Sequence, residues 1–288
     1  MNSNLERPVA WITGAGGLIG NCLIQTAPCY DPSWTVSAIT RDIIDLTDFK
    51  NLRRLFQTHR PSLIIHCAAL SSSPACQANP DLARKLNVEV TSSITELASE
   101  IPFIFLSTDL IFDGRKGDYT ETDSVKPLSV YAETKAEAEA VVLRNPKHTV
   151  IRTSLNGGTS PKGNRGFNEE LCRAWTEGQT PRLFIDEFRS PIPARVTAQA
   201  IWEFAAHHRP GIYHLAGVEK LSRWQIGTLI AARWPQLNPK IETESIANHQ
   251  GLRRPPDSSL NSGKIQKLLS FPLPGLTEWL AAHPDEVF

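Results

Sequence analysis

The fold is decided by residues 8–20, Pro8-Val9-Ala10-Trp11-Ile12-Thr13-Gly14-Ala15-Gly16-Gly17-Leu18-Ile19-Gly20. The apolar first half predicts a buried strand, and the glycines predict a tight turn that opens a helix from Leu18 to about residue 26. Such a turn lets a pyrophosphate approach backbone N–H groups at the positive end of the helix dipole. We therefore expect a dinucleotide to bind at Gly14, Gly17, Leu18, Ile19 and Gly20. The alternative is a glycine turn that only packs the strand on the helix.

Four further apolar runs continue the strand and helix alternation along the first half of the chain. Together with a shorter run, they predict strands at 34–40, 43–46, 62–69, 101–106 and 150–153, the last being the sixth strand. Helices are expected between them, including 49–59 and a long one at 81–99. This alternation is typical of an α/β protein with a doubly wound parallel sheet of the Rossmann type.

The composition restricts the functional class. Of the 288 residues, 41% are hydrophobic and 21% are charged, which is typical of a globular chain. Thirty basic and thirty acidic side chains balance, so no general attraction to nucleic acid or to a membrane surface is expected. The five cysteines form no C-x-x-C pair, and no metal-binding signature is present. No apolar run is long enough to span a bilayer, and we expect a cytoplasmic protein.

Five residues in the first half of the chain are candidates for contact with the cofactor or for support of its site. Arg41 follows the second strand, where an arginine tolerates the 2′-phosphate of NADPH, although it is alternatively a solvated loop residue. Asp45 either accepts a hydrogen bond from the adenine amine or only starts a turn. Ala68 and Ala69 leave room for a flat cofactor at the end of the 62–69 strand. Asn87 lies in an apolar helix and must find polar partners, by supporting a loop or by binding a water.

The stretch Ser-Val-Tyr-Ala-Glu-Thr-Lys places Tyr131 and Lys135 one helical turn apart, so both project from one face. A nearby ammonium lowers the pKa of a phenol, which suits proton transfer to an oxygen. Ser107-Thr108-Asp109 ends a predicted strand, and Thr108 or Ser107 would donate to a substrate oxygen beside the tyrosine. The alternatives are a solvated helix face and a simple strand-end cap.

The second half of the chain contains a smaller lobe. The loop at 156–166, rich in Gly, Ser, Pro and Lys, predicts a hinge. Arg253 and Arg254 precede two prolines and are candidates for a clamp on substrate phosphates, since guanidinium binds phosphate in a bidentate way. Paired surface arginines are the alternative.

Several motifs together resemble those of the extended short-chain dehydrogenase/reductases, most closely the dTDP-4-dehydrorhamnose reductase branch. They are TGAGGLIG, IIDLTD, LIIHCAAL, LNVEVT, FLSTDLIFDG, YTETDSVKPLSVYAETK, VIRTS, DEFRSP, GIYHL and RPPDSSL. The resemblance implies a Rossmann domain at 1–155 with a returning segment at about 191–217. It leaves 156–190 and 218–288 for the substrate-binding lobe.

The resemblance also implies roles for individual residues. Tyr131 would protonate a ketone oxygen, and Lys135 would hold the nicotinamide ribose and lower the pKa of the tyrosine. Thr108 would orient the reacting oxygen, with Ser107 as the weaker candidate. Asp45 and Leu46 would border the adenine.

The implied reaction is NADPH- or NADH-dependent reduction of a keto group on a nucleotide-linked deoxysugar, most closely dTDP-4-dehydro-L-rhamnose to dTDP-L-rhamnose. The protein would act as a monomer or homodimer. Two alternatives stay open: an epimerase or dehydratase, the dehydratase with Asp109 as its acid–base carboxylate, and a non-catalytic dinucleotide-binding subunit. The chain departs from the family pattern at Leu110, at Ala132 and at 155–158, where an aromatic usually borders the sugar.

Overall fold

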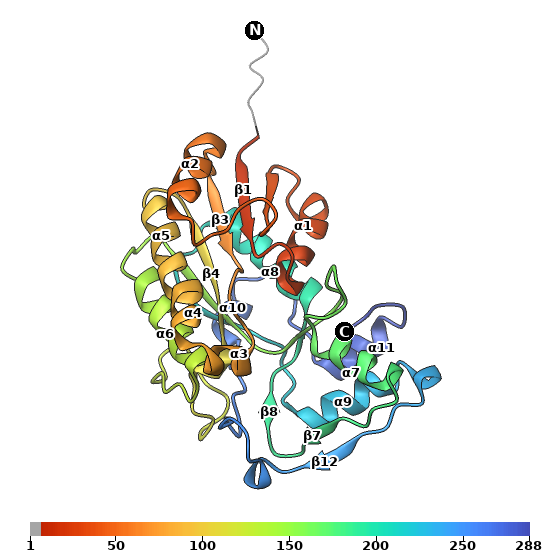
Figure 1. Ribbon diagram of the computed structural model, residues 1–288. Coiled ribbons are helices and arrows are strands. Elements are labelled where there is room, and N and C mark those ends of the chain that lie inside the picture. Colours follow the sequence, from red (N-terminus) through yellow and green to blue (C-terminus); the bar gives the residue numbers. More distant parts are fainter. Residues whose placement is uncertain (1–6) are drawn as a thin grey trace.

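A six-stranded parallel sheet organises the computed structural model, which describes residues 7–288 (Figure 1). Its strand order is β2-β1-β3-β4-β5-β10. The strands are β1 (Val9–Thr13), β2 (Thr35–Ile39), β3 (Leu63–His66), β4 (Phe103–Thr108), β5 (Thr149–Thr153) and β10 (Gly211–Leu215). The order reverses at β1, because β2 pairs with one edge of β1 and β3 with the other. In open sheets of this kind, ligands bind beyond the carboxyl ends of the strands at this reversal point.

Helices cover both faces of the large sheet (Figure 1). On one face, α1 (Leu18–Tyr30) packs against α8 (Ala194–His207). On the other face lie α2 (Phe49–His59), α5 (Val90–Leu97) and α6 (Val130–Val142). Successive side chains of β3 are buried on opposite faces of the sheet, because Leu63 and Ile65 belong to one hydrophobic cluster and Ile64 belongs to another. Both faces therefore need a cover of helices. The predicted doubly wound fold is confirmed.

The expected strand at 43–46 is wrong. Residues 40–48 form a loop, in which the N–H of Ile43 bonds the Thr40 carbonyl at 3.1 Å. Asp45 accepts from the Thr47 N–H at 2.9 Å, and Asp48 caps α2 by accepting from the Asn51 N–H. These side-chain bonds hold the backbone in turns and compete with strand pairing. The strand at 149–153 is consequently the fifth.

The helix expected at 81–99 is present but irregular. It follows α3 (Ser73–Ala78) and consists of α4 (Pro80–Arg84), a π-helical turn η1 (Lys85–Glu89) and α5. The π turn contains Asn87, which is buried. Such turns insert one extra residue and change the direction of a side chain, and they recur at functional sites.

The second lobe is built from short elements. Its helices are α7 (Phe167–Thr176), α9 (Arg223–Ala231) and α11 (Leu276–Ala282), and it contains the 3-10 turns η3 (Pro235–Leu237) and η4 (Ile246–Asn248). Two other short elements lie at the large sheet, where the 3-10 turn η2 (Asp109–Ile111) follows β4 and α10 (Gly263–Gln266) packs against β10. Three two-stranded pairs join β6 (Asn156–Gly157) to β9 (Ile192–Pro193), β7 (Arg182–Phe184) to β12 (Glu242–Glu244), and β8 (Phe188–Arg189) to β11 (Leu221–Ser222). Between these elements the chain returns to the large sheet through α8 and β10. Within residues 7–288, every helix is too short or too polar to cross a bilayer.

Candidate active site

The glycine turn after β1 combines close packing with an open side. Gly14 has a φ of 67°, and a Cβ added there would lie 2.6 Å from the Ala68 backbone nitrogen. A Cβ on Gly20 would collide with the Gly14 carbonyl, while one on Gly16 would meet nothing within 4 Å. Packing thus explains Gly14 and Gly20. At Gly16 the turn faces free space, which leaves room for a ligand.

The first turn of α1 has unused hydrogen-bond donors. Gly17 precedes the helix without a side-chain cap, and no acidic residue lies in the first turn. The Gly17 N–H bonds the Gly14 carbonyl at 2.8 Å, and the first helical bond runs from the Asn21 N–H to the Gly17 carbonyl. The amides of Leu18 and Ile19 at the start of α1 are therefore suited to an anionic group.

Asn87 fixes the chain that follows β3. Its Oδ1 accepts from the Leu70 N–H at 2.8 Å, and its Nδ2 donates to the Leu70 carbonyl at 3.2 Å and to Thr134 Oγ1 at 3.0 Å. Protein groups thus satisfy the whole amide, as expected of a residue that supports a loop. The half-buried Ala68 and Ala69 lie in this supported loop, and Asn87 also ties it to α6.

Tyr131 and Lys135 lie on one side of α6, whose first turn is capped by Ser129. Lys135 is buried, and its Nζ donates to the Leu106 carbonyl at 2.7 Å and lies 3.8 Å from the centre of the Phe105 ring. Burial lowers the pKa of Lys135 to about 7, against an opposing attraction from Glu139. The ammonium thus points to β4.

The expected lowering of the tyrosine pKa is wrong. Burial raises the pKa of Tyr131 to about 12, against the opposing effect of a hydrogen bond with Thr108. The Asp109 carboxylate raises this pKa further. The phenol therefore keeps its proton at neutral pH, which is the state that a proton donor requires.

Polar residues at the end of β4 differ sharply in their contacts. Thr108 Oγ1 accepts from the Leu110 N–H at 3.2 Å and donates to Asp109 Oδ1 at 3.2 Å. Ser107 Oγ is buried and has no hydrogen-bond partner among the described residues. Thr108 is thus the hydroxyl that lies with Tyr131, and Ser107 has unused capacity for a ligand or water.

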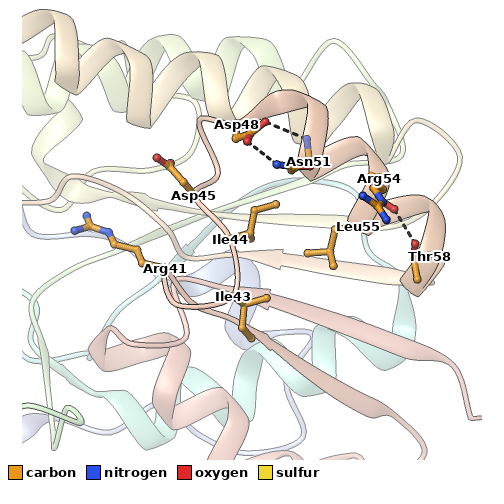
Figure 2. A pocket seen from close by; sticks show the side chains of 9 residues that line it. All are labelled: Arg41, Ile43, Ile44, Asp45, Asp48, Asn51, Arg54, Leu55 and Thr58. Carbon is orange, nitrogen blue, oxygen red and sulfur yellow. Dashed lines mark hydrogen bonds between the residues drawn. The ribbon is translucent and has the colours of Figure 1, made fainter.

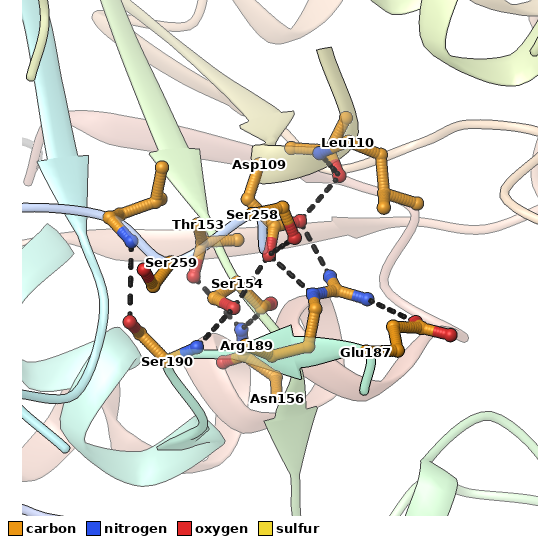
Figure 3. Close-up of polar contacts among 12 residues, drawn as sticks. Asp109, Leu110, Thr153, Ser154, Asn156, Glu187, Arg189, Ser190, Ser258 and Ser259 are labelled. Carbon is orange, nitrogen blue, oxygen red and sulfur yellow. Dashed lines mark hydrogen bonds and ion pairs between the residues drawn. The ribbon is translucent and has the colours of Figure 1, made fainter. Parts of the chain in front are cut away.

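The Asp109 carboxylate, a sequence candidate both for acid–base chemistry and for contact with substrate, is enclosed by protein partners. Its side chain has no exposed surface and accepts from Arg189 Nε at 2.6 Å and Nη2 at 2.5 Å (Figure 3). Ser154, Ser258 and Thr108 donate to the same carboxylate. With these donors in place, Asp109 has no free oxygen for acid–base chemistry.

Arg253 and Arg254, predicted as a pair, separate in the structure. Arg254 forms an ion pair with the buried Glu187, with Nη2 3.2 Å from Oε1, and its guanidinium lies 5.0 Å from the Phe184 ring. Arg253 is exposed. Only Arg254 therefore belongs to the buried charge cluster that lies beside Arg189.

Arg223 belongs to this cluster and was missed by the sequence analysis. Its guanidinium lies 3.6 Å above the Phe167 ring, and it forms no ion pair among residues 7–288. Burial lowers the pKa of Arg223 to about 10, as do Arg189 and Arg254, while Glu187 opposes the shift. A signal was available, because the capping box of Ser222 and Gln225 puts this cation at a helix N-terminus, where positive charge is unfavourable.

A cavity of about 440 Å³ opens beside the end of β2 (Figure 2). Arg41 and Asp45, predicted at the adenosine end, both line it, and Ile44 and Leu55 face one another between the loop and α2 (Figure 2). Hydrogen bonds from Thr47 lower the pKa of Asp45. Leu46 does not line the cavity and packs against the hydrophobic core. No cluster of three potential metal ligands occurs within the described residues.

Comparisons with known proteins identify the family of this chain. The chain is 28% identical to the dTDP-4-dehydrorhamnose reductase of Aggregatibacter actinomycetemcomitans, over 89% of this chain and 91% of that one. It is 26% identical to methionine adenosyltransferase 2 subunit beta of Xenopus laevis, over 90% and 82%. A crystal structure from Sulfolobus tokodaii, described as a hypothetical dTDP-4-dehydrorhamnose reductase, superposes with a TM-score of 0.82 at 29% identity, covering 93% and 97%. The family model of the RmlD substrate binding domain matches residues 10–287, and the chain therefore belongs to this family.

Proposed function

We propose that the protein reduces the keto group of a nucleotide-linked deoxysugar with NADPH or NADH, and that dTDP-4-dehydro-L-rhamnose is its substrate. It is an NAD(P)-dependent oxidoreductase. The observation that carries the proposal is the position of Tyr131 in the first turn of α6, where its phenol meets Thr108 at the carboxyl end of β4. That end of the sheet also carries the open glycine turn.

The residues present fit a dinucleotide. Amides at the start of α1 suit its pyrophosphate, Ala68 and Ala69 border its path, and Arg41 and Asp45 line the cavity at the adenosine end. Lys135 would hold the nicotinamide ribose. When bound, the reduced cofactor supplies a hydride to the carbonyl carbon.

Tyr131 supplies the proton. As the carbonyl oxygen gains negative charge, the phenol transfers its proton to that oxygen, and the product is an alcohol. On substrate binding, the Thr108 hydroxyl would turn from Asp109 Oδ1, its acceptor in this structure, and donate to the same oxygen to orient it. A proton held at a pKa of about 12 is released only when this charge develops, which directs the transfer to the reacting oxygen.

The geometry opposes the dehydratase alternative, because the Asp109 carboxylate is sealed by Arg189 and two serines. The subunit alternative remains, because methionine adenosyltransferase 2 subunit beta matches most of the chain. The experiment below distinguishes it from the reductase.

The test is NADPH oxidation, followed by absorbance, with dTDP-4-dehydro-L-rhamnose and other 4-keto nucleotide sugars. One NADPH consumed per alcohol formed, with the product identified by mass spectrometry, is the expected result. A changed sugar without net oxidation would establish an epimerase or dehydratase, and dinucleotide binding without any turnover would establish the subunit. The same preparations give the preference for NADPH over NADH and the oligomeric state, which we propose to be monomer or homodimer.

The five free thiols support a reducing, cytoplasmic compartment.

A further inference from the structure

Tyr131, Lys135 and Glu139 follow one another at intervals of four residues along α6. They therefore lie on one side of the helix, and Lys135 and Glu139 are each 3% exposed. In the proposed function, Tyr131 transfers the proton and Lys135 contacts the cofactor. The third, a fully enclosed carboxylate one turn beyond the lysine, has no assigned task.

Glu139 is held rigidly by Arg152 of β5. Arg152 Nε lies 3.1 Å from both carboxylate oxygens, and Nη2 lies 2.8 Å from Oε2. Arg152 is also 3% exposed, and its guanidinium lies 5.4 Å from the Phe112 ring. This geometry fixes the carboxylate in its charged form, since a bidentate arginine stabilises the anion.

His214 of β10 extends the network without adding charge. Its Nδ1 lies 2.9 Å from the Tyr119 carbonyl and donates to it, so its Nε2 accepts from Arg152 Nη1 at 3.3 Å. This pattern assigns the neutral tautomer, and burial together with Arg152 lowers the pKa of His214 to about 3. Arg152 is thus oriented by a neutral acceptor on one side and by the Glu139 anion on the other.

The other titratable groups around Lys135 are uncharged or already neutralised at neutral pH. Burial lowers the pKa of His66 to about 3 and raises the pKa of Cys67 to about 12. Tyr131 keeps its proton, Cys76 is a buried thiol on α3, and Asp109 is paired with Arg189. Glu139, one helical turn from Lys135 on α6, is therefore the anion that acts on it, and Arg152 is the ion-pair partner of Glu139.

We propose that Glu139, fixed by Arg152, is a positioning residue that keeps the buried Lys135 side chain charged and directed at the cofactor site. Lys135 has one protein acceptor, the Leu106 carbonyl, and otherwise meets the Phe105 ring. An ammonium in such surroundings is stable only with an anion nearby. The role of Lys135 at the cofactor rests on the proposed function, whereas the effect of Glu139 on the charge of Lys135 does not.

The test compares two single variants whose effects have opposite sign. Affinity for NADPH, measured by isothermal titration calorimetry against pH, should decline in the parent as pH rises and Lys135 loses its proton. Glu139→Gln removes the attraction and leaves the Arg152 cation, so the midpoint of the decline should move to lower pH by about one unit or more. Arg152→Gln removes the repulsion and leaves the carboxylate, so the midpoint should move to higher pH.

A purely structural ion pair predicts a different result. Both variants would then lower the melting temperature and leave the midpoint where the parent has it, which would overturn the proposal. The exposed pair of Glu242 and Arg182 provides a control, since Glu242→Gln should change neither quantity. If Glu139→Gln does not fold, the direction of the Arg152→Gln shift decides alone.

The experiment also separates this inference from the proposed function. A parent protein that binds NADPH with this pH dependence but reduces no nucleotide sugar would refute the reductase and leave the role of Glu139 standing. If the parent reduces the sugar but Glu139→Gln has the same midpoint as the parent, the role of Glu139 is refuted and the reductase stands.

Discussion

Asp109 and Arg189 form a two-pronged ion pair with N–O distances of 2.6 and 2.5 Å, and it joins the end of β4 to β8 of the second lobe (Figure 3). Ser154 and Ser258 close the remaining side of the carboxylate. Four chain segments far apart in sequence thus meet at one buried charge. The pair positions the strand end that carries Thr108, and so it links the fold of the second lobe to the geometry of the site.

Asp109→Asn should therefore cost stability before it affects chemistry. The substitution leaves Arg189 buried without its anion, and breaking such a pair costs about 3–5 kcal/mol. Urea denaturation measures the free energy of unfolding. Glu242→Gln is the matched control, because its ion pair with Arg182 is exposed and should contribute about 0–1 kcal/mol. A loss for Asp109→Asn no larger than that of the control would contradict the structural role.

Glu187 should make the protein sensitive to acid. Burial alone would raise the pKa of its carboxyl, but Arg223, Arg254 and Arg189 outweigh burial and hold this pKa below its ordinary value of 4.5. A lowered pKa in the folded state stabilises the protein above pH 4.5, and this contribution is lost as pH falls through the folded-state pKa. Glu187→Gln should be less stable than the parent at neutral pH, and the difference in free energy of unfolding should shrink below pH 4.5. A difference that stays constant with pH would refute this account.

The sequence predicted the fold well because its signals are local. Alternating burial along β3, the glycine turn and the caps of α2 and α6 are each set by neighbouring residues. The expectation failed at 43–46, where a run with apolar residues resembles a strand but Asp45 and Asp48 hold the backbone in turns.

The candidate site was less predictable, since much of it depends on long-range contacts. The spacing of Tyr131 and Lys135 is local, but the direction of the Lys135 ammonium depends on the Leu106 carbonyl of β4. The sealing of Asp109 involves residues 80 and 149 positions away, Arg189 and Ser258. The charge cluster that contains Arg223 likewise forms only when the second lobe folds.

Tyr131→Phe should remove the transferable proton and little else. Loss of a general acid typically costs about 10²–10⁴-fold in turnover, while affinity for NADPH should stay close to that of the parent. Tyr119→Phe is the control, because that phenol donates to Asp113 at 2.8 Å in a loop outside the catalytic group and should keep most of the rate. Steady-state kinetics and calorimetry provide the two readouts. A Tyr131→Phe enzyme that retained the parent rate would remove the proposed acid.

Lys135→Met should separate stability from function. Methionine places an apolar chain in a pocket that disfavours the ammonium, so the free energy of unfolding should stay equal or rise. Turnover and NADPH affinity should both fall, because the charged contact to the cofactor is lost. Thermal melting, kinetics and calorimetry on one preparation give the three values. Unchanged cofactor affinity in a stable variant would show that Lys135 does not contact the dinucleotide.

Arg223 should contribute to recognition of the substrate's phosphate groups. Arg189 and Arg254 share the carboxylates of Asp109 and Glu187, whereas the Arg223 guanidinium stacks on Phe167 without an ion-pair partner in the described part of the chain. Burial, together with Arg189 and Arg254, lowers the pKa of Arg223, and an anionic ligand beside it would stabilise its charge.

Arg223→Gln should therefore raise KM for the nucleotide sugar by roughly 10–100-fold, the worth of a charge-assisted hydrogen bond, with kcat little changed. Arg253→Gln removes an exposed arginine of the same charge and should leave KM within about twofold of the parent, because a solvated rim charge contributes little. Titration with the free nucleoside diphosphate isolates the phosphate contribution from that of the sugar. If Arg253→Gln weakened binding and Arg223→Gln did not, the diphosphate would lie at the exposed end of the 250–257 segment and not above Phe167.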